Sequence, residues 1–367
     1  MDSGELEVCH ERAISHIRAQ AVKLQPEARA TLQHIYRMSN MPQTGVDDAK
    51  ATIREYARVA LHFHPDRPTR AGEQCRLVAR ALLEDGIYKS QFETGISNGL
   101  VAMQAGGLRD QWEEKLFNGA YQGEAVQPSH RPKYGALDLM RNADGPAPRF
   151  GSCYFVLKPH VSSRSTFTFG GSQDQPKYCG TADEFDAILS ALMEECFVRD
   201  FALGVANVRP ATVAAYIEAL KMPTPSQQVF SSMAASRNLD HMIEAQIHGM
   251  VRLDSDVEAL VADPSFQGTD AGRDLESMAT KYGFPLRYHC GFALDVDCVP
   301  PDFRGPSMLS LAARVAKGGV VNTACIGYAV QDLTRDPESW KDRGIFAEVL
   351  QELKLLWHVL VRYGGPK

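Results

Sequence analysis

Apolar residues recur at spacings of three and four along the first part of the chain, which is the pattern of helices with one buried face. The repeating positions are Ala13, Ile14, Ile17 and Ala21, and then Ile53, Tyr56, Ala57 and Ala60. Residues 40–45, which include a proline and a glycine, interrupt the pattern. Residues 11–60 are therefore predicted to be helical, with a break at 40–45.

From residue 87 onward the chain changes to short strand-like runs bounded by glycines, at 134–139, 153–158 and 165–169. Helical periodicity returns at 184–195 and 211–220, a strand-like segment follows at 242–253, and an amphipathic helix is predicted for 345–363. These patterns predict an α+β fold. Its predicted parts are a helical N-terminal region (1–60), a β-rich core (61–255) and a mixed, largely helical C-terminal region (256–367).

The composition restricts the classes of function. The chain has 367 residues, 44% of them hydrophobic, and a formal net charge of -6 without a basic run, which argues against nucleic acid as the main partner. No apolar run approaches the roughly 18 residues of a membrane span, and residues 1–11 lack the features of a secretory signal. We expect a soluble protein, either cytoplasmic or delivered to a target cell. The eight cysteines form no CxxC pair, which predicts reduced and mostly buried thiols.

The most unusual stretch is His62-Phe63-His64-Pro65-Asp66-Arg67, with two imidazoles, a carboxylate and a guanidinium in six residues. On an extended segment, His62, His64 and Asp66 would project from the same face, because strand side chains repeat every two residues. Such a group suits a metal centre, the contact loop of a J-domain cochaperone, or a sugar-phosphate pocket.

Two further segments have the composition of a ligand site. Residues 91–99 alternate small hydroxyl residues with larger ones and contain two glycines, which predicts a strand edge for a polar planar ligand or an ordinary strand-to-turn transition. In residues 243–249, Glu244, Gln246 and His248 would share one face of a strand, opposite three apolar side chains. This is either the wall of a ligand pocket or a strand that faces solvent.

Aromatic residues elsewhere are better explained by packing. Tyr134, Phe167 and Phe169 lie in the strand-like runs and are expected in the core. Trp112 lies in a charged segment, which predicts a surface helix with the indole buried.

Four motifs occur in a fixed order. They are His62-Phe63-His64-Pro65-Asp66-Arg67, Gln91-Phe92-Glu93-Thr94-Gly95-Ile96-Ser97-Asn98-Gly99, Arg131-Pro132-Lys133-Tyr134-Gly135-Ala136-Leu137 and Ile243-Glu244-Ala245-Gln246-Ile247-His248-Gly249. In this combination the chain resembles the CteC-like family of bacterial and microbial-eukaryote ADP-ribosyltransferases, which corresponds to a domain long catalogued as of unknown function. The resemblance covers roughly residues 10–330. It implies an ADP-ribosyltransferase-like split β-sheet core, NAD as the donor, and a threonine hydroxyl of ubiquitin as the acceptor.

The resemblance also implies a catalytic aspartate and glutamate, which fall on Asp66 and Glu244. Glu244 would stabilise the positive charge that develops on the ribose as nicotinamide leaves, and Asp66 would accept the proton of the threonine hydroxyl. No metal would be required. The residues expected to contact NAD are His62, His64, Arg67, Gln91, Thr94, Ser97 and Gln246.

Two alternatives remain open. The His64-Pro65-Asp66 sequence resembles the loop of J-domain cochaperones, with a helix before it and residues 77–83 as a helix after it. Metal hydrolases also carry a His-x-His pair after a first strand, as in His62 and His64. Further ligands for that metal would be His160, His248 and His289.

Overall fold

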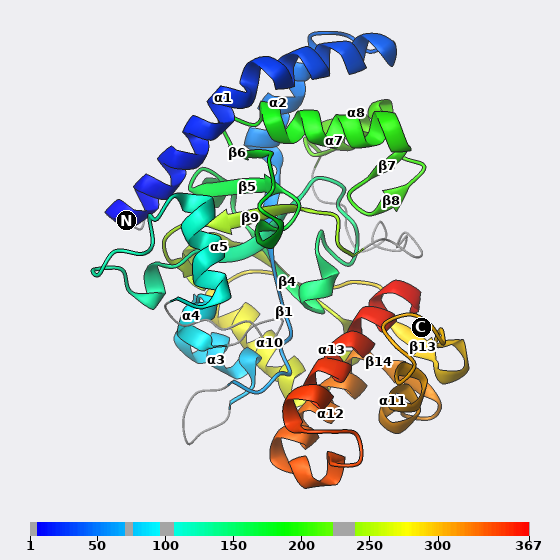
Figure 1. The fold of residues 1–367 in the computed structure, drawn as a ribbon. Coiled ribbons are helices and arrows are strands. Elements are labelled where there is room, and N and C mark those ends of the chain that lie inside the picture. The colour runs from blue at the N-terminus through cyan, green and yellow to red at the C-terminus, as the bar shows by residue number, and fades with distance from the viewer. Residues whose placement is uncertain (1–5, 70–75, 96–105, 223–238, 367) are drawn as a thin grey trace.

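A computed structural model describes residues 6–69, 76–95, 106–222 and 239–366. Its centre is a sheet of eight strands in the order β12-β11-β4-β1-β3-β9-β5-β6 (Figure 1). In that order the strands are β12 (Leu286–Tyr288), β11 (Val257–Ala262), β4 (Cys153–Leu157), β1 (Arg58–Phe63), β3 (Lys133–Asp138), β9 (Ile243–Ile247), β5 (Ser165–Phe169) and β6 (Cys179–Thr181). Neighbouring strands are antiparallel except β11 and β12, which are parallel. The fold is therefore mixed α+β around one large, continuous sheet.

The strand register gives the two faces of the sheet different chemistry. Ala136 of β3 pairs with Ala60 of β1 and with Glu244 of β9, so these three side chains share a face. Two residues further along, the same face carries His62, Tyr134 and Gln246. The opposite face carries the apolar side chains Leu61, Phe155, Phe167, Ile243, Ala245 and Ile247. The predicted division of residues 243–247 into a polar and an apolar face is confirmed, but the strand is buried on both faces and does not face solvent.

Helices from the N-terminal and middle parts of the chain, residues 8–282, cover the apolar face. They share one hydrophobic core with the strands, and α1 packs along α7 and β6 (Figure 1). These helices are α1 (Val8–Met38), α2 (Gly45–Tyr56), α3 (Val78–Asp85), α7 (Asp186–Arg199), α8 (Pro210–Ala219) and α10 (Asp270–Tyr282). The apolar stripe of each helix is thus buried against the sheet or against another helix.

The polar face is covered by shorter elements and by a C-terminal unit with its own core. The shorter elements are α4 (Gln91–Thr94), α5 (Leu108–Phe117), the turn η2 (Pro148–Phe150) and the turn η3 (Ser172–Asp174). The C-terminal unit contains β13 (Ala293–Asp295), α11 (Met308–Val315), β14 (Val320–Asn322), α12 (Thr323–Arg335) and α13 (Phe346–Tyr363). It lies at one side of the molecule in Figure 1, and α13 reaches back to η2.

The remaining elements are short. They are β2 (Ile87–Tyr88), η1 (Pro128–His130), α6 (Pro159–Ser162), β7 (Phe201–Ala202), β8 (Val205–Ala206), β10 (Val251–Arg252), α9 (Leu253–Asp256), η5 (Pro264–Phe266), η6 (Val296–Cys298) and η7 (Pro337–Trp340). Within the described ranges no helix is both long and apolar enough to cross a bilayer. The seven described cysteines are free thiols, and five of them are buried.

Most predicted elements are confirmed, and three expectations need correction. Residues 58–60 begin the central strand β1 and do not continue the preceding helix. Residues 91–94 form the short helix α4, not a strand edge, because the Ser90 side chain caps the helix. The expected boundary after residue 255 is not an edge of the sheet, since β11 and β12 lie beyond it and β11 pairs with β4.

Candidate functional site

A cavity of about 490 Å³ lies on the polar face of the sheet. Its floor is formed by His62 of β1, Tyr134 of β3 and Glu244 of β9. A smaller hollow of about 170 Å³ adjoins it, and the residues common to both are His62, Tyr88, Gln91, Tyr134 and Phe150. The larger cavity alone falls within the range of about 300–1,000 Å³ that is usual for small-molecule sites.

Glu244 is held at the floor of the cavity by two hydrogen bonds to one carboxylate oxygen. Its Oε1 accepts from Nε2 of Gln246 at 3.0 Å and from the backbone N–H of Ser172 at 3.2 Å. Burial raises the pKa of the Glu244 carboxyl, whereas these hydrogen bonds and the charge of Arg109 act to lower it. The carboxyl group is therefore fixed in orientation and is a weaker acid than an exposed glutamate.

Gln246 does not line the cavity and instead supports Glu244 from behind. It is fully buried, it accepts from the Thr166 hydroxyl at 2.9 Å, and its Nε2 also approaches the Thr168 hydroxyl oxygen at 3.1 Å. The expected contact between Gln246 and NAD is corrected accordingly. Its position two residues along the same strand makes it a positioning residue for Glu244.

His62 lines both hollows, but its two ring nitrogens are already engaged. Nε2 accepts from the backbone N–H of Ala147 at 3.2 Å, so Nδ1 carries the proton and donates to the carbonyl oxygen of Gly151 at 3.0 Å. The ring also stacks on Tyr154. His62 therefore fixes the segment around η2 and presents only the surface of its ring to the cavity.

The smaller hollow contains the expected residues His64, Arg67, Gln91 and Thr94. Burial and the charge of Arg67 hold the pKa of His64 well below its ordinary value, so its imidazole is neutral. The Thr94 hydroxyl donates to the Ser90 carbonyl within α4. Among the described residues, Oε1 of Gln91 is buried without a hydrogen-bond partner, which makes it the group most clearly suited to meet a ligand donor.

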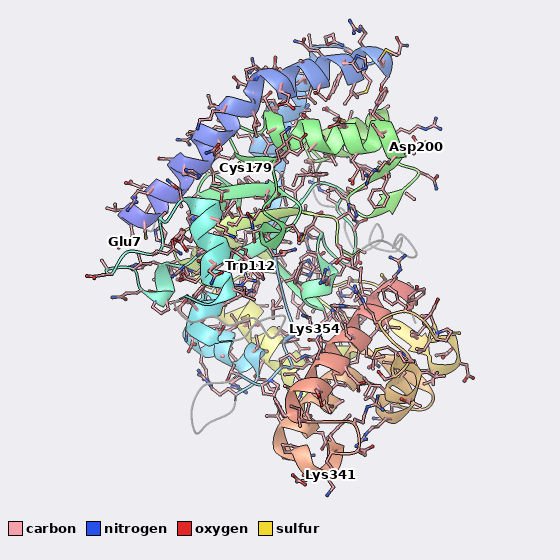
Figure 2. The ribbon with its side chains drawn as sticks, in the orientation of Figure 1. Glu7, Trp112, Cys179, Asp200, Lys341 and Lys354 are labelled. Atoms are coloured by element: carbon pink, nitrogen blue, oxygen red, sulfur yellow. The ribbon has the colours of Figure 1, made fainter. Side chains whose placement is uncertain are left out.

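Three arginines that were not predicted line the larger cavity. Arg109 of α5 lies over the ring of Tyr134, with 4.8 Å from its guanidinium carbon to the ring centroid. Arg149 of η2 and Arg304, which precedes α11, both approach Asp240. Trp112, which Figure 2 labels beside α5, was expected to be buried but is half-buried and lines the same cavity. Tyr134 is a floor residue as well as a packing residue. No spacing in the sequence links these positions, because the fold brings them together from four distant segments.

Asp66 lies apart from Glu244, which contradicts the expected catalytic pair. The extended segment ends at Phe63 and the chain turns at residues 65–67, so Asp66 is not on the face of His62. Its carboxylate packs against Gly327 of α12, and it lines neither of the hollows described above. It is 4% exposed, and Nη1 of Arg67 lies 3.5 Å from its Oδ1.

The remaining expectations have mixed outcomes. Ser97 lies outside the described residues. Within the described ranges, no three His, Cys, Asp or Glu side chains are grouped to hold a metal ion. The other histidines of the metal hypothesis have separate partners: His160 contacts Asp256, His248 contacts Tyr121 and Thr166, and His289 contacts the Ser152 carbonyl.

The J-domain hypothesis requires a helix before the His64-Pro65-Asp66 loop and a helix after it. The loop instead follows strand β1, although helix α3 does come after the loop.

The sequence matches the family described as "Protein of unknown function (DUF3626)" over residues 58–363. The match begins at the first residue of β1 and ends at the last residue of α13, so it includes the whole sheet, the cavity and the C-terminal unit. No curated protein matches the chain. Because the match spans most of the sequence, the chain belongs to the DUF3626 family, a family of proteins of unknown function.

Proposed function

We propose that the protein is a mono-ADP-ribosyltransferase that moves ADP-ribose from NAD to a hydroxyl group of a protein. The observation that carries the proposal is the position of Glu244, a buried carboxylate held by Gln246 and Ser172 at the floor of a cavity that also contains Arg109, Tyr134 and Gln91. The resemblance of the four sequence motifs to the CteC-like transferases supports the same activity.

Glu244 acts on the bond between ribose C1′ and the nicotinamide nitrogen. As this bond breaks, its electron pair moves to the nicotinamide ring, and positive charge develops on the ribose. An ionised carboxylate beside the ribose favours that charge, as in glycosidases. Both hydrogen bonds that fix Glu244 end on Oε1, so Oε2 is the oxygen that we expect to face the ribose. The positive nicotinamide ring of NAD would also favour the ionised form of this glutamate.

The hydroxyl of the acceptor forms a bond from its oxygen to C1′ and releases a proton. Because Asp66 does not line the cavity that contains Glu244, we assign the base to a carboxylate that does. Asp174, at the end of η3, lines the cavity and is exposed to solvent, where an acceptor protein can approach it. It lies two residues after Ser172, whose backbone N–H binds Glu244. We assign proton acceptance to Asp174.

The two adjoining hollows suit the two halves of NAD. The smaller one has apolar walls from Val78, Leu82, Tyr88 and Phe150, which suit a purine ring. Gln91 lies between the hollows with a free carbonyl oxygen that can accept from an amide or amino group of the dinucleotide. Arg109 lies within the larger cavity, where it can contact a phosphate.

The acceptor follows from the resemblance alone, which implies a threonine of ubiquitin. The test is incubation of the full chain with biotin-labelled NAD and ubiquitin, with free nicotinamide measured and ubiquitin analysed by mass spectrometry. The proposal expects release of nicotinamide and an ADP-ribosylated threonine. Release without modified ubiquitin would indicate a different acceptor, and the absence of both would contradict the proposed activity.

A further inference from the structure

Helix α13 places cationic and polar side chains against the turn η2. Trp357 anchors this contact, since Nε1 of its indole lies 3.1 Å from the carbonyl oxygens of both Pro148 and Arg149. Lys354 precedes Trp357 by three residues and His358 by four, so Lys354 and His358 share one side of the helix. Figure 2 labels Lys354 on the side of α13 nearer the central sheet. Arg149 and Arg304 lie close enough to both side chains to act on them electrostatically.

Several polar atoms of this cluster have no hydrogen-bond partner among the described residues. His358 is 1% exposed, and neither of its ring nitrogens has a hydrogen-bond partner. The Nε atoms of Arg149 and Arg304 are also buried without partners. Lys354 forms no ion pair with any described residue. Buried polar groups in proteins almost always have partners, so the unpartnered atoms of His358, Arg149 and Arg304 indicate a ligand.

The charges of the cluster act against one another. Burial and the charges of Arg149 and Arg304 lower the pKa of Lys354 to about 8, and the same causes with Lys354 lower the pKa of His358 to about 3. The acidic groups nearby are Asp240, which contacts Arg149 but is half exposed, and Asp174 at the cavity rim. At neutral pH the cluster therefore holds three partly buried cations and a neutral histidine.

We propose that Arg149, Arg304, Lys354 and His358 form a binding site for a phosphate-type anion, which helix α13 completes from the C-terminal unit. Guanidinium groups match the geometry of phosphate oxygens, and the lysine adds a point charge. Neutral His358 can donate one N–H to the anion. Arg149 and Arg304 line the larger cavity, so the anion can be the diphosphate of a dinucleotide or a separate phosphate group in the same cavity.

The test uses pyrophosphate and the full chain in calorimetry at low salt. The wild-type chain should bind, and Lys354→Met and Arg149→Gln should each weaken the Kd at least about tenfold, since a charged hydrogen bond contributes that much. Lys341→Met changes an exposed lysine next to η7 and should leave the Kd unchanged (Figure 2). Thermal unfolding checks that each variant is folded, and pyrophosphate should raise Tm much less in Lys354→Met than in Lys341→Met. Absence of binding by the wild type, or equal binding by Lys354→Met, would overturn the site.

Two further arms separate this inference from the proposed activity. If NAD and pyrophosphate compete, the site holds the diphosphate of the donor, and if they bind together it holds a second anion. Glu244→Gln should not weaken pyrophosphate binding, so failure of the transferase activity leaves the anion site intact. Conversely, ADP-ribosyl transfer by a chain that does not bind pyrophosphate would overturn the anion site alone.

Discussion

The side-chain amide of Gln246 donates to the carboxylate of Glu244 at 3.0 Å, from a position two residues along the same strand. The alternation of β9 places both side chains on the polar face, and the hydroxyls of Thr166 and Thr168 contact Gln246 from the neighbouring strand β5. The orientation of the cavity carboxylate is therefore determined by two paired strands and not by a loop. A substitution of Gln246, which supports Glu244, should consequently alter the pKa and the activity of Glu244.

Gln246→Leu tests this support. The variant removes the hydrogen bond that most strongly lowers the pKa of Glu244, so that pKa should rise further. Transfer requires the ionised carboxylate, so activity is lost as pH falls through this pKa, and the acidic limb of kcat/KM should move to higher pH. The lost partners of buried groups should also destabilise the fold by about 1–3 kcal/mol. The control is Gln33→Leu at an exposed position of α1. An unchanged pH profile in Gln246→Leu would show that Gln246 does not position Glu244.

The revised assignment of the base predicts different outcomes at Asp174 and Asp66. Asp174→Asn should lose transfer to protein much more than slow hydrolysis of NAD, because water can use other bases. Asp66→Asn should retain both activities, since its carboxylate lies outside the cavity. Both activities are measured as nicotinamide release with and without acceptor. If Asp66→Asn lost transfer to protein while Asp174→Asn kept it, and circular dichroism showed that Asp66→Asn is folded, Asp66 would be the proton acceptor.

The contact between Asp66 and Gly327 predicts a specific steric effect. A Cβ atom at position 327 would overlap the Asp66 carboxylate, so Gly327→Ala must move that side chain, the residue 64–67 turn or α12. We expect a loss of about 1–3 kcal/mol in the free energy of unfolding, despite the higher helix propensity of alanine. Adding Asp66→Ala should restore part of the loss, and Gly365→Ala, where no atom lies within 4 Å, should cost little. Additive losses in the double variant would contradict the contact.

The lowered pKa of Lys354 predicts how stability changes with pH. Its folded-state pKa is about 8, below the unfolded value near 10.5, so the unfolded chain binds more protons between these values. The charged lysine therefore disfavours the folded state below pH 8, and this penalty disappears as pH rises from about 8 to 10.5. Without an anion, Lys354→Met should have a higher Tm than the wild type at pH 7, and the difference should shrink by pH 10. If the difference in Tm between Lys354→Met and the wild type stayed constant from pH 7 to pH 10, burial of the charged lysine would not disfavour the folded state.

The sequence predicted the regular elements of this fold better than the geometry of its site. Strand alternation correctly placed Glu244 and Gln246 on one face, because a period of two is visible in a few residues. It failed for Asp66, because the strand ends at Phe63 and the chain turns at residues 65–67. Residues 90–93 contain the S-x-x-E signature of a helix start, so α4 could have been predicted. Arg109, Arg149 and Arg304 could not, since their proximity depends on how α5, η2 and the C-terminal unit pack over the sheet.

Glu244→Gln gives the most direct test of the proposed transferase activity. The amide is close in size and can still accept from Gln246 or Ser172, but it carries no charge to stabilise the ribosyl cation. The measurement pairs the Kd of NAD from calorimetry with the rate of nicotinamide release for the wild type and for Glu244→Gln. We predict that the variant keeps NAD binding within a few-fold and loses nicotinamide release by at least about a hundredfold. Release at a near-normal rate in a folded Glu244→Gln variant, or no NAD binding by the wild type, would contradict the central claim.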